Sequence, residues 1–540
     1  MHTMGLRSLL LLVLVMTAMQ VAAQRAVPVK DTVLKGTAIE VVQSYKPQIY
    51  QTPKPTWLPQ LPPVDTTHPV FNYEVPQQTL YYTYSSMPLR PLALGKENAT
   101  LPFPGYIKLG GGNISTLYFE GANTLHQDNY DVNLHFHYLS QEGNIRYQKT
   151  SIAGIEAEWM LHTVKADWHA GISGERNQYH NYGYNHNLYT YNSDSVKQTY
   201  TSVNFDAGMK NAANASSKLS YNPSINGYYY SAAFNTSEIN VGLDLPVAYK
   251  FDNTVQALLC LKGNLAHLAV KSNGFDNSFA ELLPGVKIDL PNFTGTALVG
   301  LAAGINSKFF VLPDISAVYS LKEQHMQFLA GLQSSLVQNT YKQLTAVNPY
   351  LSNSYTTLQT RSDEYYLGAK GSLGDHFDYS GRISYWNYKG LPEFMNNYFD
   401  NRRFVVAYDT LSAVAVRVIG RYKTAEKWSA GISGDFYAYS KKVWHQPTVR
   451  IKGDYEAVFF KKLHAGASVY FLGGTYALNN SNKSILLSPV LDAGVNAEYQ
   501  ITRRLSAFAD ICNIFNSINE RWYGYEAYGI NIYGGLRLKF

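Results

Sequence analysis

The most unusual local sequence of the chain is a tyrosine-rich stretch at residues 179–192, YHNYGYNHNLYTYN. Its tyrosines are Tyr179, Tyr182, Tyr184, Tyr189 and Tyr191. Interleaved with Asn and His, these rings could stack on sugar rings while their hydroxyl groups form hydrogen bonds. His180 and His186 could also bind a soft metal. The alternative is a surface loop whose tyrosines pack on each other or on a neighbouring surface. We therefore treat the stretch as a candidate ligand-binding loop.

Other reactive side chains form no recognisable catalytic motif. The chain has 14 histidines, yet it shows no nucleophile elbow, paired carboxylates or metal-ligand spacing. Gly110-Gly111-Gly112 has no helix after it, so a strand bend or hairpin is expected there rather than a phosphate site. We predict no enzyme activity, no cofactor and no resident metal.

The chain has only two cysteines, Cys260 and Cys512, and both fall inside strand patterns. A disulfide is an alternative in an oxidising compartment. Because the two residues are far apart in the sequence, we expect two buried free thiols.

A period-2 pattern at residues 527–540 predicts the kind of element that carries these side chains. One side of the pattern holds Tyr528, Ile530, Ile532, Gly534, Leu536, Leu538 and Phe540. The other side holds Gly529, Asn531, Tyr533, Gly535, Arg537 and Lys539. A strand of this kind has one apolar and one polar face. In outer-membrane barrels lipid-facing and lumen-facing residues alternate in this way, and Phe540 fits the terminal barrel assembly signal.

The same alternation recurs along the chain, for example at residues 130–138, 164–172, 428–436 and 463–471. From residue 105 onward it predicts about 22 strands of roughly 9–14 residues, a length that lets a tilted strand cross a bilayer. Counts of about 18–20 are alternatives, since residues 105–123 can form one strand or two. No sustained 3.6-residue period follows residue 100, so helices are expected to be a minor element.

The predicted connections alternate between long and short. Long polar connections fall near 141–149, 174–198, 269–277, 339–360, 390–403, 440–446, 476–485 and 517–527. Tight joins fall at 162–163, 251–253, 322–324, 374–376, 424–426 and 460–462. Long outer loops and short periplasmic turns are typical of outer-membrane barrels. Long and short connections alternate along most of the chain, with the long ones after odd-numbered strands, which independently supports a barrel.

Composition is compatible with this interpretation. Charged residues make up only 16% and aromatic residues 14%, including 44 tyrosines, and tyrosine suits the membrane–water interface. Residues 1–23 fit a secretory signal peptide, with Arg7 before an apolar run and Val21-Ala22-Ala23 at the end. Its removal lowers the formal net charge of +6 by one. This small positive net charge fits contact with acidic lipopolysaccharide and does not argue for binding of nucleic acid.

Residues 24–104 differ from the rest because they hold more than half of the 22 prolines. Such a segment favours extended structure over a helix or sheet. We interpret it as a periplasmic arm or a partial filling of the lumen, with a disordered spacer as the alternative. Trp57, Leu58 and Leu61 make this segment more apolar than a simple spacer.

The end of the chain resembles TonB-dependent receptors. The resemblance rests on CNIFN at residues 512–516 and on GINIYGGLRLKF at residues 529–540. It implies a barrel of about 22 strands that moves a solute across the outer membrane. Those receptors carry a globular plug, whereas only 81 residues (24–104) precede the first strand here. Residues 38–42, AIEVV, resemble the short box that such receptors present to an inner-membrane energy transducer.

A barrel of this width encloses a lumen with a polar wall. The predicted lining includes Asp131, His135, Lys165, Asp167, Arg417, Arg421, Arg537 and Lys539. These side chains form either a hydrated wall or a selective ring of charge.

Together these observations predict an all-β protein: a large antiparallel transmembrane β-barrel at 105–540 behind the proline-rich segment. We expect it in the outer membrane of a Gram-negative bacterium, in contact with lipopolysaccharide and the barrel assembly machinery. Residues 24–104 would face a periplasmic or energy-transducing partner. The expected function is a transporter or pore for a solute. The alternative is a structural or partner-binding barrel with an occluded lumen.

Overall fold

The computed structural model describes residues 103–212, 217–233, 235–304, 308–352, 358–396, 402–424, 427–479 and 481–540. The predicted signal peptide (1–23) and nearly all of the proline-rich segment (24–104) lie outside the described residues. No helix in the described part of the chain is long and apolar enough to cross a membrane.

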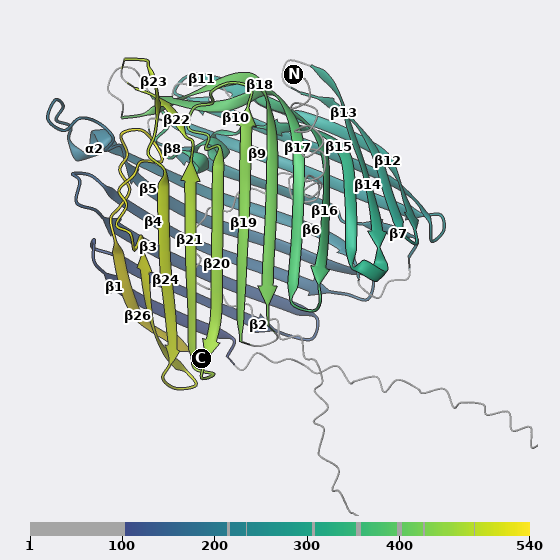
Figure 1. Ribbon diagram of the computed structural model, residues 1–540, viewed down its shortest axis with the longest axis horizontal. Helices are drawn as coiled ribbons and strands as arrows, with labels where there is room; N and C mark the ends of the chain where they lie inside the picture. Colours follow the sequence, from purple (N-terminus) through teal and green to yellow (C-terminus); the bar gives the residue numbers. More distant parts are fainter. Residues whose placement is uncertain are drawn as a thin grey trace, which may run out of the picture. The chain divides into compact units, whose positions relative to one another are not determined.

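Twenty-two antiparallel strands form a closed barrel (Figure 1). The first strands of its wall are β1 (Gly105–Gly112), β2 (Leu117–His126), β3 (Tyr130–Glu142), β4 (Lys149–His162), β5 (Ala166–His180), β6 (Lys197–Asn211), β8 (Ser224–Ala232), β9 (Thr236–Lys250), β10 (Val255–Val270), β12 (Phe279–Leu290) and β13 (Phe293–Ala303). The wall continues with β14 (Phe309–Leu321), β15 (Met326–Gln338), β16 (Gln359–Leu373), β17 (Phe377–Asn396), β18 (Phe404–Lys423), β19 (Trp428–Tyr439), β20 (Val449–Phe459), β21 (Leu463–Gly473), β24 (Val490–Gln500), β25 (Leu505–Cys512) and β26 (Asn531–Lys539). The predicted fold class and strand count are confirmed.

The remaining elements are short. β7 (Leu219–Tyr221) precedes β8 and, like it, pairs with β9. β11 (Asn273–Asp276) precedes β12 and, like it, pairs with β10. β22 (Tyr476–Leu478) and β23 (Ser484–Leu486) form a separate hairpin. The helical elements are α2 (Ser193–Val196), η2 (Lys322–Gln324) and α3 (Tyr341–Val347).

The seam between β1 and β26 closes the barrel. The two strands pair from Tyr106 opposite Lys539 to Gly112 opposite Tyr533. Beyond this ladder, the Gly105 amide donates to the Phe540 carbonyl at 3.2 Å, and the Phe540 amide donates to the Gly105 carbonyl at 3.0 Å. In lipid every backbone polar group needs an internal partner, so closure removes the two edges that an open sheet would expose.

The predicted alternation matches the two faces of the wall. On β26 the side chains of Ile532, Leu536 and Leu538 are 47–52% exposed, whereas Asn531 and Tyr533 on the opposite face are buried. Phe540 also lies on the outward face and is 49% exposed. Exposed apolar side chains on the outside of a closed barrel form a lipid-facing surface.

The predicted strand at 527–540 is too long at its start, since β26 begins at Asn531. Residues 528–530 belong to the last loop because turn asparagines take their backbone groups. Asn513 Nδ2 donates to the Tyr528 carbonyl at 2.7 Å, and the Ile530 amide donates to Asn516 Oδ1 at 2.8 Å. Side chains thus replace the ladder partners that a longer strand would need.

The predicted long loops lie at one end of the barrel and the predicted short turns at the other. The loop end also has short connections at 113–116 and 271–272, and the second falls inside the predicted long connection 269–277, where β11 pairs with β10. Short turns include 163–165 and 460–462, and the long loops include 339–358 and 513–530. The segment at 105–123 forms parts of two strands, β1 and β2, joined by residues 113–116. The Gly110–Gly112 run therefore ends a strand before a hairpin.

Cys260 and Cys512 are free thiols, as predicted. Cys260 is buried, whereas Cys512 is half-buried and not fully buried as expected.

A glycine substitution at the seam tests closure. A Cβ atom at Gly535 would lie 1.8 Å from the Leu109 carbonyl oxygen, which is backbone and cannot rotate away. We expect Gly535→Ala to lower the free energy of unfolding by about 1–3 kcal/mol, measured by urea unfolding in lipid vesicles. Gly263→Ala is the control, because a Cβ there meets nothing within 4 Å. Equal stability of the two variants would contradict a tightly packed seam.

Candidate functional site at the loop end of the barrel

The connection between β15 and β16 folds into the mouth of the barrel. It carries α3, whose N-cap Thr340 and N3 residue Gln343 form a capping box. Tyr341 is fully buried against Tyr200, Tyr230 and Leu268, which belong to β6, β8 and β10. These three side chains point inward, since their strand neighbours on the other face are exposed. The helix therefore reaches from one part of the wall to the inner face of another.

Glu238, on the inner face of β9, holds the start of α3. Its carboxylate accepts hydrogen bonds from the Tyr341 amide at 2.6 Å, the Lys342 amide at 3.3 Å and the Tyr228 hydroxyl at 2.7 Å. The side chain is only 1% exposed. An anion at a helix N-terminus satisfies free amides and interacts favourably with the helix dipole. Glu238 thus fixes the loop to the barrel wall.

Two hydroxyl groups on the wall anchor the rest of the loop. The Tyr230 hydroxyl lies 2.6 Å from Thr345 Oγ1, and the Tyr200 hydroxyl donates to the Pro349 carbonyl at 2.8 Å. Burial raises the pKa of Tyr341 well above its usual value. The phenols at this contact are therefore neutral hydrogen-bonding groups.

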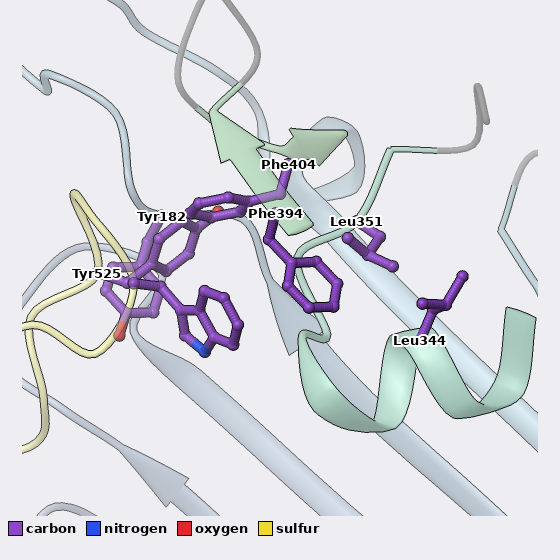
Figure 2. Packing of buried hydrophobic residues seen from close by; sticks show 7 residues of the cluster. Tyr182, Leu344, Leu351, Phe394, Phe404 and Tyr525 are labelled. Carbon is purple, nitrogen blue, oxygen red and sulfur yellow. The ribbon is translucent and has the colours of Figure 1, made fainter. Parts of the chain in front are cut away.

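A buried cluster, here called the cap, joins the loop ends (Figure 2). Its members are at most 6% exposed and are Tyr182, Leu344, Leu351, Phe394, Phe404, Trp522 and Tyr525. They come from four separate parts of the chain: the loop after β5, the β15–β16 loop, the facing ends of β17 and β18, and the β25–β26 loop. The rings of Tyr350 and Tyr525 stack with centroids 3.7 Å apart, and Tyr182 meets Tyr525 edge-on at 4.9 Å.

Hydrogen bonds tie the β25–β26 loop into the cap. The Tyr182 hydroxyl and Gln148 Nε2 both donate to the Glu526 carbonyl, at 2.8 and 3.0 Å. Burial raises the pKa of Tyr182 to about 12, so the phenol keeps its proton at neutral pH. These contacts bring strands that are distant around the wall into one cluster.

His445 links two cap segments as a neutral imidazole. Its Nε2 accepts from the Tyr523 amide at 3.3 Å, which assigns the donor role to Nδ1, and Nδ1 donates to the Phe394 carbonyl at 2.7 Å. Burial lowers the pKa of His445 to about 4. The imidazole is therefore uncharged at neutral pH and can make both bonds.

The five tyrosines of the predicted ligand loop divide into two groups. Tyr182 and Tyr184 are buried, and Tyr179 is half-buried at the end of β5. Tyr189 is 42% exposed and stacks on the half-buried Tyr191 at 6.2 Å. Part of the predicted loop is thus cap structure, and its tip remains accessible.

Arg402 and Tyr147 lie beside the accessible tip of the tyrosine-rich loop. The Arg402 guanidinium lies 3.8 Å from the ring centroid of Tyr191, and the Tyr147 hydroxyl donates to the Tyr191 carbonyl at 3.0 Å. His180 and His186 each contact a backbone carbonyl, at 3.0 and 3.1 Å. Among the described residues, no three His, Cys, Asp or Glu side chains are arranged so that they could hold one metal ion.

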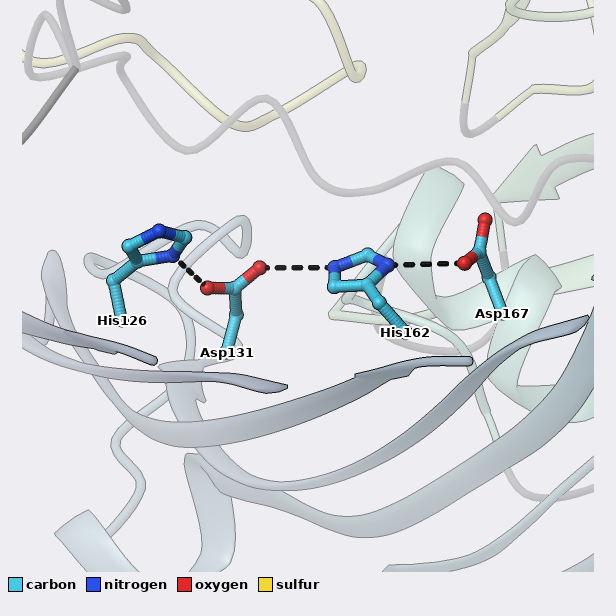
Figure 3. Close-up of polar contacts among 4 residues, drawn as sticks. All are labelled: His126, Asp131, His162 and Asp167. Atoms are coloured by element: carbon cyan, nitrogen blue, oxygen red, sulfur yellow. Dashed lines mark hydrogen bonds and ion pairs between the residues drawn. The ribbon is translucent and has the colours of Figure 1, made fainter. Parts of the chain in front are cut away.

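Charged side chains of the predicted lumen wall are largely paired. Figure 3 shows Asp131 bound to His126 and, at 3.2 Å, to His162, which meets Asp167 at 3.0 Å. Other predicted wall residues pair as His135–Glu120 at 3.5 Å, Arg417–Asp435, and Arg537–Glu498 at 3.2 Å. Arg421 on β18 and Lys539 on β26 follow the inward register, whereas Lys165 lies in the β4–β5 turn and not on the wall. Most of the predicted wall residues thus lie beside an ionisable partner of opposite type.

Sequence reasoning missed Glu238, the cap residues Phe394, Phe404 and Trp522, and the pair Arg382–Glu364. One signal was present: Thr340 and Gln343 have the spacing of a capping box. The cap residues and the Arg382–Glu364 pair contact partners that are distant in the sequence, so no local pattern marks them.

The closed barrel of 22 strands has the fold of the TonB-dependent outer-membrane receptors. No protein-family model matches the chain, and no curated protein matches it.

Several solved structures share this fold. The FrpB iron transporter from Neisseria meningitidis (F3-3 variant) is 10% identical, with TM-score 0.64 over 81% of each chain. The pyoverdine outer membrane receptor FpvA from Pseudomonas aeruginosa is 14% identical, with TM-score 0.60 over 82% of this chain and 79% of that one. The ferric enterobactin receptor PfeA from P. aeruginosa is 10% identical, with TM-score 0.59 over 81% and 80%.

Replacing Glu238 tests whether it holds the in-folded loop. In Glu238→Gln an amide NH₂ would replace an oxygen that accepts a backbone or phenol hydrogen. We expect trypsin to cleave after Lys342 roughly tenfold faster, since one buried hydrogen bond to a charged group is lost. Asp206→Asn is the control: Asp206 is an exposed inner-wall carboxylate with only a 3.9 Å contact to His169. Unchanged cleavage in Glu238→Gln would rule out this anchoring role.

The buried imidazole predicts a pH dependence of the cap. The pKa of the His445 imidazole is 6.5 in the unfolded chain and about 4 in the folded protein. The neutral imidazole therefore contributes its full stabilisation above about pH 6.5, and this stabilisation is lost as the pH falls from there to about 4. Hydrogen-exchange protection of the Tyr523 amide should fall up to about tenfold per pH unit there. His445→Gln should flatten this profile, and amides inside α3 should keep their protection. A parallel decline in both segments would contradict the assignment to His445.

Proposed function

We propose that the protein is a gated outer-membrane transporter for a solute. The observation that carries this proposal is the cap, which joins loops from separate parts of the wall over the lumen. A passive pore has no need for an occluded mouth. A transporter that admits one solute and excludes others does need one.

The architecture supports a gate that moves without disturbing the barrel. The wall is held by inter-strand backbone ladders. The cap is held by ring packing and a few side-chain bonds, such as Tyr182 to the Glu526 carbonyl. Loops that make few ladder hydrogen bonds open at lower free energy than strands do. Opening of the cap would therefore leave the barrel intact.

The accessible tip of the tyrosine-rich loop supports a role in first contact with the solute. Tyr189 offers an exposed ring, and Arg402 beside Tyr191 adds a positive charge. This combination suits a ligand with a flat ring face, such as a sugar or aromatic ring, that also carries a negative charge. The proteins with similar folds are named for iron, pyoverdine and ferric enterobactin. At 10–14% identity those ligands do not carry over.

Two further expectations belong to the same proposal. Phe540 closes the seam on the lipid-facing side, which supports its role as the signal read by the barrel assembly machinery. The segment at 24–104 is proposed as the periplasmic arm that meets an energy-transducing partner or enters the lumen. We also expect the outer surface to contact lipopolysaccharide.

One observation favours the second candidate, a structural or partner-binding barrel with a permanently filled lumen. The ion pair of Arg382 and Glu364 lies on the inner wall, yet the two side chains are only 3% and 2% exposed. Burial of wall charges is expected of a filled lumen more than of a hydrated one.

Planar-bilayer recording of the folded protein separates the candidates. We expect the native protein to show little conductance, and a variant with residues 341–350 replaced by a Gly/Ser linker to show discrete, steady channels. A Gly-Ser replacement at the exposed hairpin tip, residues 271–272, is the control and should stay closed. Large steady conductance of the native protein would contradict the gate. A silent linker variant would favour the filled barrel.

A further inference from the structure

Three neighbouring turns at the short-turn end of the barrel carry an unusual concentration of positive charge. They follow β18, β20 and β24 and contribute Lys427, Lys461, Lys462, Arg503 and Arg504, with Lys423 at the end of β18. All six side chains are exposed. None of them makes an ion pair with another residue in the part of the chain that the structure describes. The sequence adds a single acidic residue in these turns, Glu426. We call this surface the basic rim.

Other turns at the same end of the barrel carry acidic side chains. The turns after β2, β9 and β16 carry exposed Asp128, Asp252 and Asp375. Lys322 in η2 is followed directly by Glu323. Lys165, Lys250 and Lys322 are exposed as well, but each lies at a separate turn. The positive charge is therefore most concentrated in one sector of the turn end. A confined positive potential attracts anions to that sector.

Lipid-facing aromatic side chains lie directly beside the basic rim. Trp428 follows Lys427 and stacks on Tyr422 at 4.8 Å, and Tyr455 lies 5.9 Å from Trp428. Tyr499, just before the β24–β25 turn, is 50% exposed on the same outward face. Rings of this kind mark the depth of the lipid headgroups. The cations at the adjoining turns can therefore reach headgroup phosphates.

The β20–β21 turn adds a second, independent observation. Phe460 and Lys461 both have positive φ, at 52° and 59°. Tight turns of this kind favour Asn-Gly, and bulky residues there cost free energy. Phe460 is nevertheless 91% exposed at the tip. A strained turn that displays an aromatic ring beside two cations suggests a contact outside the chain.

We propose that the basic rim binds anionic phospholipid of the periplasmic leaflet, with its cations on the headgroup phosphates and Phe460 against the lipid. A phospholipid fits better than a protein partner because the cations follow the curve of the rim at headgroup depth. Each cation near an anionic surface strengthens binding several-fold. The site is separate from the cap and does not depend on the proposed transport function.

Spin-labelled lipids test the proposal with the full chain in phosphatidylcholine vesicles. Electron paramagnetic resonance measures the relative association of labelled phosphatidylglycerol and labelled phosphatidylcholine with the protein. We expect a preference for phosphatidylglycerol that weakens with added salt. The triple variant Lys427→Gln, Lys461→Gln, Lys462→Gln should reduce that preference about fivefold or more.

A matched variant removes the same charge from other turns. Lys165→Gln, Lys250→Gln, Lys322→Gln changes three exposed lysines outside the basic rim, and it should keep the preference for phosphatidylglycerol. Far-UV circular dichroism confirms that both variants are folded. The proposal is overturned if the native protein shows no preference for phosphatidylglycerol, or if the two triple variants lose it equally. No preference would instead point to a protein partner for this surface.

Discussion

The rest of the structure depends on the requirement that every backbone amide and carbonyl in the bilayer finds a partner within the chain. The pairing of β1 with β26 meets that requirement by closing the sheet on itself. Closure needs the two strands to approach closely, which the glycines on both sides of the seam permit. The backbone hydrogen bonds that close the wall run between strands and do not involve the loops.

This independence allows the loop end to have a chemistry of its own. The in-folded α3 and the cap bury aromatic side chains, and Glu238 on β9 holds the start of α3 by accepting three hydrogen bonds. The anchoring groups come from the inner wall, so the barrel acts as a rigid frame for the mouth. The energies involved are those of side-chain packing and single hydrogen bonds, small beside the ladders of the wall.

The two ends of the barrel differ in how they treat charge. At the loop end His445 is held neutral by burial, and the phenols of the cap keep their protons. Along the inner wall charges are paired, as in Arg537 with Glu498. At the turn end one sector carries unpaired cations beside lipid-facing rings. The mouth is thus closed by apolar packing, the wall charges are largely paired, and the exposed cations gather at the turn end.

The sequence by itself determined the wall, because the alternation of apolar and polar residues in a strand is local. Ile532, Leu536 and Leu538 reveal the lipid-facing side of β26 without any knowledge of their partners. The long and short connections were likewise visible, and so was the tyrosine-rich loop. Only the tertiary structure decided what the loops do. Tyr182 meets Tyr525, and Glu238 meets the start of α3, across long stretches of chain. Such contacts depend on barrel closure and loop geometry, which leave no periodic trace in the sequence.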